Sequence, residues 1–175
     1  MLLVGIQQYR VVALQGMVSI ETKGKNEAIA ANLESQKTIT TLQGEAMIIA
    51  IGLQESDFLA RRQYENGPAR GFWQFERDGG VKGVMEHPAT TSYAAAICLE
   101  RGVPFERVKV WAALETDDLL AVVFARLLLW SDPKSLPAVT EQAAAWSLYS
   151  RTWRPGKPHP GKWPECHANA LRVLA

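Results

Sequence analysis

Residues 45–76 read EAMIIAIGLQESDFLARRQYENGPARGFWQFE, an apolar run followed by a glutamate and then by a glycine-rich aromatic segment. Positions 46–51 are apolar without a break, and Leu53 continues the run. A helix that is apolar on all sides belongs inside a core, although a short apolar run alone is also compatible with a strand. Because the pattern extends from about Leu42 to Arg61, it is too long for a typical strand. We therefore expect a buried central helix over 42–61.

Glu55 stands near the end of this apolar run. Desolvation and the negative end of the helix dipole would both raise the pKa of its carboxyl group. Arg61 or Arg62 would lower that pKa if either pointed inward. A glutamic acid that stays protonated near neutral pH can donate a proton to a glycosidic oxygen. The alternative interpretation is an ordinary surface glutamate beside two arginines.

Two motifs follow each other here at a characteristic spacing. Residues 55–58 read ESDF and residues 67–74 read GPARGFWQ. They resemble the Glu-Ser-x-Phe and Gly-x-x-Gly-Leu-Met-Gln motifs of the lysozyme-like superfamily, most closely those of soluble lytic transglycosylases and goose-type lysozymes. The resemblance covers roughly residues 40–100 well, and residues 67–76 (GPARGFWQFE) look most like phage-encoded members.

The resemblance implies a role for each matching residue. Glu55 would be the catalytic acid and base, Gln74 would contact a bound sugar, and Gly71 would let the backbone approach the glycan. The full set of residues that we predict to bind substrate is Ser56, Gly71, Phe72, Trp73, Gln74, Tyr149, Trp153 and Arg154.

The chain also departs from the family pattern. Three residues separate the two glycines instead of two, and Phe72-Trp73 replaces a smaller aliphatic pair. The family's Ala-Tyr-Asn-Ala-Gly segment is absent as such, and residues 145–149 (AWSLY) are the nearest candidate. Residues 70–75 (RGFWQF) also resemble the Arg-Gly-x-x-Gln segment of chitinase-type endolysins, which share the fold and have a second catalytic carboxylate.

Several acidic residues could supply such a second carboxylate. The candidates are Asp57, Glu65, Glu76 and Asp78, and Glu76 is preferred because it directly follows the aromatic strip, residues 72–75. Glycosidases that retain or invert configuration differ in the separation of their two carboxyl groups, which a sequence does not give. The alternative for Glu76 is a surface residue that organises the loop.

The segment 151–164, RTWRPGKPHPGKWP, is basic and aromatic and contains no acidic residue. Peptidoglycan carries carboxylates on its stem peptides, and sugar rings stack on aromatic faces. This basic loop could therefore form one wall of a glycan groove. Alternatively, its tryptophans cover the core while its charges stay in solvent.

Composition limits the other possibilities. The chain has 175 residues, of which 47% are hydrophobic and 21% charged, as expected for one globular domain. A net charge of +1 argues against a nucleic-acid binder, and no apolar stretch is long enough to predict a membrane span. The histidines and cysteines show no metal-ligand spacing, so we expect no metal and no cofactor. Cys98 and Cys166 could pair, but two reduced thiols are expected.

The expected architecture is mainly α, a single lysozyme-like domain. Residues 1–40 would be an N-terminal extension and a possible docking element, and residues 41–175 the catalytic domain. Besides the central helix, the capping and breaking residues predict helices over about 27–36, 81–87, 91–100, 104–113, 117–130 and 140–152, and a short helix at the C-terminus. Thr90 or Thr91 would cap the helix over 91–100, and residues 116–118 (TDD) would cap the helix over 117–130. Because positions 119–130 are apolar except at Arg126, this helix should be the second mostly buried one.

These features together predict a peptidoglycan-cleaving muramidase of lytic transglycosylase type. The N-terminus lacks the features of a signal peptide, so we expect synthesis in a host cytoplasm and action at the bacterial cell wall, as a phage lysis protein or within a virion. Partners would be glycan strands and possibly other virion proteins. The alternative is a structural virion protein of the tail or ejection apparatus that keeps the lysozyme-like fold with little or no turnover.

Overall fold

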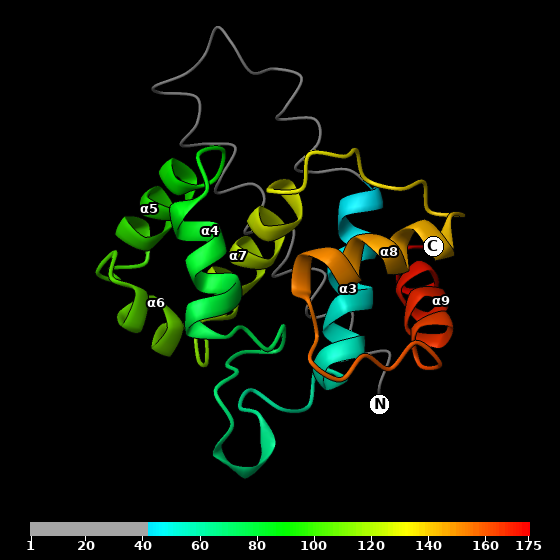
Figure 1. Ribbon diagram of the computed structural model, residues 1–175, viewed down its shortest axis with the longest axis horizontal. Helices are drawn as coiled ribbons and strands as arrows, with labels where there is room; N and C mark the ends of the chain where they lie inside the picture. Colours follow the sequence, from blue (N-terminus) through cyan, green and yellow to red (C-terminus); the bar gives the residue numbers. More distant parts are fainter. Residues whose placement is uncertain (1–41) are drawn as a thin grey trace, which may run out of the picture.

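A computed structural model describes residues 42–175, apart from the side chain of Asn66. This part of the chain is mainly helical, as predicted, and contains isolated β-bridges but no β-strand (Figure 1). The predicted N-terminal extension and the predicted helix over 27–36 lie outside the described residues. The α-helices are α3 (Leu42–Ser56), α4 (Lys82–Glu86), α5 (Thr91–Glu100), α6 (Arg107–Ala113), α7 (Asp118–Trp130), α8 (Gln142–Trp153) and α9 (Trp163–Leu174); the short helical turns are η1 (Tyr64–Asn66) and η2 (Arg77–Val81).

Helix α3 is buried along most of its length, as its unbroken apolar sequence predicts. Gly44 and every residue from Ala46 to Gln54 are buried. The helix ends at Ser56, five residues before the predicted end at Arg61. It ends there because the next two residues, Asp57 and Phe58, adopt left-handed backbone conformations with φ of 52° and 55°.

This early end is coupled to a glycine inside the helix. The ring of Phe58 folds back onto α3, so that a Cβ atom on Gly52 would lie 2.1 Å from Phe58 Cζ. Only a residue without a side chain leaves room for the ring at this position. The turn after α3 is thereby packed against the helix that it terminates.

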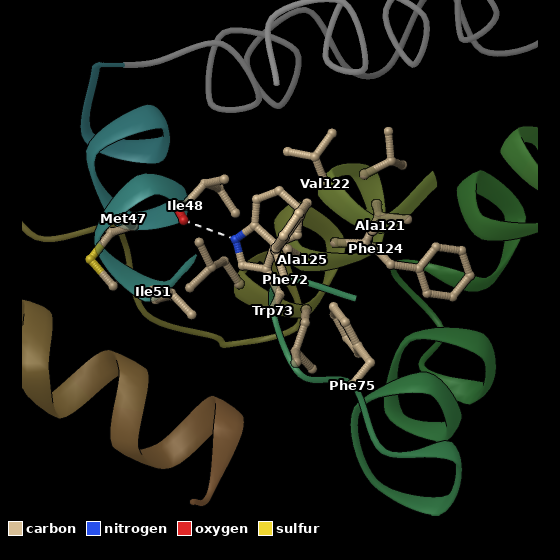
Figure 2. Close-up of a cluster of buried hydrophobic side chains, with 14 of the residues drawn as sticks. Met47, Ile48, Ile51, Phe72, Trp73, Phe75, Ala121, Val122, Phe124 and Ala125 are labelled. Atoms are coloured by element: carbon tan, nitrogen blue, oxygen red, sulfur yellow. Dashed lines mark hydrogen bonds between the residues drawn. The ribbon is translucent and has the colours of Figure 1, made fainter. Parts of the chain in front are cut away.

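The aromatic strip packs between α3 and α7 (Figure 2). Trp73 is 1% exposed, and its indole Nε1 donates a hydrogen bond of 2.9 Å to the carbonyl oxygen of Ile48. Phe75 meets Phe124 of α7 edge to face, with ring centroids 6.4 Å apart, a separation typical of aromatic pairs. The strip therefore belongs to the hydrophobic core.

Helix α7 is the second buried helix, as its sequence predicts. The side chain of Asp117 accepts a hydrogen bond of 3.0 Å from the backbone N–H of Leu120, which confirms the predicted cap. All residues from Leu120 to Leu129 are buried, including Arg126. Burial lowers the pKa of Arg126 to about 10, which leaves the guanidinium charged at neutral pH.

Helix α5 has the predicted bounds, and the ends of α4, α6, α7 and α8 lie within three residues of their predicted positions. Helix α6 begins at Arg107 and not at Pro104, and α8 runs from Gln142 to Trp153. Thr90 precedes α5 as predicted, but its hydroxyl does not cap that helix. It donates instead a hydrogen bond of 2.6 Å to the carbonyl oxygen of Val84 and so ties α5 to α4.

The helices form two groups, with α7 in contact with both (Figure 1). Helices α4, α5 and α6 lie on one side, and α3, α8 and α9 lie on the other, where α9 packs along α3. Cys98 and Cys166 are both buried and unpaired, as expected. None of the described helices has the length and apolar character needed to cross a membrane.

Candidate functional site

A cleft of about 1300 Å³ opens beside the C-terminal end of α3. Its walls come from four segments that are distant in sequence. They are the end of α3 with the loop after it (residues 55–64), the end of the aromatic strip with η2 and α4 (residues 74–87), the end of α7 with the residues after it (128–133), and the last turn of α8 with the loop after it (151–159). Glu55, the predicted acid, is one of the lining residues.

Glu55 is half-buried in the wall of the cleft. Desolvation is the main cause that raises its pKa to about 7, well above the ordinary 4.5, and the negative charge of Glu76 adds to the increase. A hydrogen bond from Tyr149 and the positive charge of Lys162 act in the opposite direction. The desolvation effect dominates, so that a substantial fraction of Glu55 is protonated at neutral pH.

Tyr149 is the direct hydrogen-bonding partner of Glu55. Its hydroxyl donates a hydrogen bond of 2.7 Å to Glu55 Oε1. The ring is buried and stacks on Trp163 with ring centroids 5.3 Å apart. Desolvation and the neighbouring Glu55 raise the pKa of Tyr149 far above its ordinary value, so the hydroxyl keeps its proton. Tyr149 thus fixes the orientation of the carboxyl group from beneath and does not itself line the cleft.

Lys162, in the basic loop, closes the C-terminal end of α3. Its ammonium group donates hydrogen bonds to the carbonyl oxygens of Leu53 (2.6 Å) and Gln54 (3.2 Å) and to Oδ2 of Asp57 (2.9 Å). Carbonyl groups at a helix C-terminus have no partners within the helix. One side chain therefore satisfies two of them and places a positive charge near Glu55.

Two of the predicted substrate-binding residues, Ser56 and Gln74, line the cleft and also hold its wall together. The hydroxyl of Ser56 donates to the carbonyl oxygen of Phe72 at 2.7 Å and accepts from the N–H of Phe58 at 3.2 Å. The side-chain amide of Gln74 donates to the carbonyl oxygen of Gly71 at 2.8 Å. Ser56 therefore ties the aromatic strip to the end of α3, and Gln74, which also donates to the carbonyl oxygen of Ala60 at 3.3 Å, ties the strip to the loop after α3.

Three other predicted substrate-binding residues lie in the core. Gly71, Phe72 and Trp73 are buried, and none of them lines the cleft. Gly71 has a left-handed φ of 69°, and a Cβ atom there would lie 2.5 Å from the carbonyl oxygen of Leu114. Its position is therefore explained by close packing against the backbone before α7.

Different parts of the basic loop (151–164) fit the two interpretations, one part lining the cleft and the other covering the core. Trp153 and Arg154 line the cleft together with Lys157. The indole Nε1 of Trp153 donates a hydrogen bond of 2.9 Å to the carbonyl oxygen of Trp73, so this ring is fixed against the strip. Trp163, by contrast, is buried in the core at 2% exposure. The first half of the loop thus forms a wall of the cleft, and its end covers α3.

The candidate second carboxylates differ in their surroundings. Glu76 lines the cleft, is exposed, and forms no ion pair within the described part of the chain. Asp78 also lines the cleft but pairs with Arg77 and Arg107, and Asp57 pairs with Lys162. Glu65 is exposed and is not among the lining residues.

The two arginines that follow the ESDF motif, Arg61 and Arg62, pair with acidic residues other than Glu55. Arg61 forms an ion pair with Asp118, and Arg62 pairs with Glu115 at 2.9 Å. Neither contributes to the pKa shift of Glu55. Their role is to anchor the loop after α3 to the start of α7.

Left-handed backbone conformations at non-glycine residues are concentrated around the cleft. Asp57, Gln74 and Arg154, with φ of 52°, 50° and 49°, all line it. Each such residue costs of the order of 1 kcal/mol, and strain of this kind is frequent at functional sites. The other two such residues among those described, Phe58 and Glu65, do not line the cleft.

Sequence reasoning missed three residues of this site. Lys162 stands in the basic loop, but nothing in the sequence shows that it reaches α3. Leu59 and Tyr64 line the cleft and are highly exposed, and only their position beside the ESDF motif hints at this. Within residues 42–175, no group of three or more potential metal ligands is present.

Comparison with known proteins gives no relative: no family model, no curated protein and no solved structure matches this chain.

Proposed function

We propose that this chain is a peptidoglycan-cleaving muramidase in which Glu55 is the general acid and base. The observation that carries the proposal is Glu55 itself, a carboxyl group with a pKa of about 7 in the wall of a large cleft, oriented by the hydroxyl of Tyr149. A carboxylic acid poised near the working pH is suited to both donating and accepting a proton.

The proposed reaction uses both protonation states of Glu55. The protonated form donates its proton to the oxygen of the bond between N-acetylmuramic acid and N-acetylglucosamine, and that bond breaks at the muramyl C1. The resulting carboxylate then removes the proton from the muramyl 6-hydroxyl, whose oxygen bonds to C1. The product is a 1,6-anhydro sugar, no water is consumed, and Glu55 is protonated again. Tyr149 would stabilise the carboxylate between the two steps.

Two basic side chains in the wall of the cleft support a substrate that carries carboxylates. Arg154 and Lys157 line the cleft and form no ion pair with any described residue. Both remain available for the carboxylates of peptide stems. In keeping with the sequence resemblance, we propose that the protein is phage-encoded and acts in lysis or in wall penetration by a virion.

Hydrolysis is the second candidate reaction, and one observation favours it. Glu76 lines the same cleft and is close enough to Glu55 for its charge to raise the pKa of Glu55. A carboxylate in that place could activate a water molecule, as in glycosidases that use two carboxyl groups.

Mass spectrometry of the products distinguishes the two reactions. Purified protein is incubated with peptidoglycan sacculi, and the released muropeptides are weighed; anhydro products are lighter than hydrolytic products by one water. Glu55→Gln should lower the rate at least about a hundredfold, the lower range for loss of a general acid. Glu106→Gln is the matched control, because Glu106 is exposed, lies outside the cleft lining and does not cap α6 with its side chain. A folded wild-type protein that releases nothing from sacculi would refute the proposal.

A further inference from the structure

The loop after α3 presents two large apolar side chains to solvent. Leu59 is 77% exposed and Tyr64 is 82% exposed, yet both line the cleft that contains Glu55. This loop projects beyond the C-terminal end of α3 (Figure 1). An isolated exposed leucine needs no explanation, but two exposed apolar residues on the wall of one cleft indicate a binding surface.

The loop that carries Tyr64 is firmly held on both sides. Before it, the guanidinium of Arg62 makes hydrogen bonds of 2.9 Å to both carboxylate oxygens of Glu115. After it, the N–H of Gly67 donates to the carbonyl oxygen of Tyr64 at 3.2 Å, and the N–H of Gln63 donates across the loop to Ala69 at 3.2 Å. The ring is therefore exposed on an ordered turn.

The backbone beside Tyr64 is also strained. Glu65 has a left-handed φ of 57°, a conformation that costs a residue with a side chain of the order of 1 kcal/mol. The strain is not offset by burial of Tyr64, whose ring lies in solvent. The left-handed backbone at Glu65 destabilises the fold while the neighbouring Tyr64 ring stays exposed, and strain of this kind is frequent where a residue has a function.

We infer that Tyr64 and Leu59 form a platform on which a sugar ring of the glycan strand stacks at the rim of the cleft. The inference rests on the proposed function for the identity of the ligand. The C–H bonds on one face of a pyranose ring make that face apolar, and an exposed aromatic ring and an exposed aliphatic side chain that line the same cleft suit such a face. The tyrosine hydroxyl remains available to the sugar's hydroxyl groups. Such a platform binds the polymer without touching the bond that is cleaved.

The test measures binding separately from cleavage. Protein carrying Glu55→Gln is mixed with purified peptidoglycan sacculi or with chitin, which has the sugar backbone and no peptide stems, and the fraction that sediments is measured. Adding Tyr64→Ala should weaken binding to both polymers about three- to tenfold, the range expected for one lost aromatic contact. Tyr64→Trp should restore it.

Leu59→Ala and Leu99→Ala form a matched pair of controls. Both leucines are about equally exposed, at 77% and 80%, but only Leu59 lines the cleft. Leu59→Ala should weaken binding and Leu99→Ala should not.

Cleavage by the Tyr64→Ala protein with Glu55 intact gives a second readout. The KM for the polymer should rise, and kcat should stay within about twofold of the wild-type value.

Unchanged binding of the Tyr64→Ala protein, or no binding of the parent protein to either polymer, would overturn the proposal that Tyr64 and Leu59 bind the glycan. If binding depends on Tyr64 but wild-type protein cleaves nothing, the platform stands and the proposed reaction fails.

Discussion

The hydroxyl of Tyr149 donates a hydrogen bond of 2.7 Å to Oε1 of Glu55, across 94 positions of sequence. This bond joins α8 to the end of α3 at the point where both helices reach the cleft. It acts on Glu55 in two ways, because it holds the carboxyl group in one orientation and favours its charged form. Desolvation opposes the second effect and is larger, so the pKa stays near 7.

Replacing Tyr149 by phenylalanine should separate these effects. Without the donor, the carboxylate of Glu55 is less stable, and its pKa rises further. The alkaline limb of the pH profile of kcat/KM, which follows loss of the proton from Glu55, should move to higher pH. The maximal rate should fall about tenfold, as expected if a hydrogen bond to a charged group worth about 1.5 kcal/mol is lost. An alkaline limb that stays in place would show that Tyr149 does not tune Glu55.

The raised pKa of Glu55 also makes the stability of the fold depend on pH. The unfolded chain has the ordinary pKa of 4.5 and the folded chain about 7, so the folded state binds more protons between these values. The contribution of Glu55 to the free energy of unfolding is therefore fully present below about pH 4.5 and is lost as the pH rises towards 7. The shift of about 2.5 corresponds to roughly 3 kcal/mol.

Urea denaturation across this pH range checks the expectation, with Glu55→Gln as the comparison. The glutamine variant has no carboxyl group to ionise at this position, so this part of the pH dependence should disappear. Equal slopes for wild type and Glu55→Gln between pH 4.5 and 7 would contradict the raised pKa.

Local sequence features predicted much of the fold. The apolar runs of α3 and α7, the second interrupted only by Arg126, identified the two buried helices, and Asp117 marked the start of α7, because apolar pattern and capping are properties of neighbouring residues. The end of α3 was placed at Arg61, five residues too late. That end depends on the ring of Phe58 fitting over Gly52, a packing detail that no local pattern specifies.

The candidate site was predictable only in part for the same reason. Glu55 was identified because the apolar residues before it in the sequence predict that its carboxyl group is desolvated. The burial of Trp73 was not foreseen, because its indole N–H bonds to Ile48, 25 positions away. Lys162 reaches Asp57 across 105 positions, and such contacts exist only once the chain has folded.

Lys162 offers a test of the electrostatics around Glu55. Replacing it by methionine removes a positive charge that lowers the pKa of Glu55, so that pKa should rise and the alkaline limb of the activity profile should move to higher pH. The carbonyl groups of Leu53 and Gln54 also lose their partner, and the fold should lose about 1–3 kcal/mol. Lys162→Arg keeps the charge and should keep the profile. A methionine variant with an unchanged pH profile would show that this charge does not reach Glu55.

Gly71 can be assigned to packing or to glycan contact by comparison with Gly102. Both have a left-handed φ, 69° and 66°, but a Cβ atom would meet the carbonyl oxygen of Leu114 at 2.5 Å only at Gly71, whereas the space around Gly102 is open. Gly102→Ala should therefore cost only the backbone strain, about 1 kcal/mol, and Gly71→Ala should cost about 1–3 kcal/mol more because the backbone before α7 must move. Thermal and urea denaturation of the two variants measure the difference. Equal losses of stability, together with weaker glycan binding by Gly71→Ala alone, would favour the glycan contact over packing.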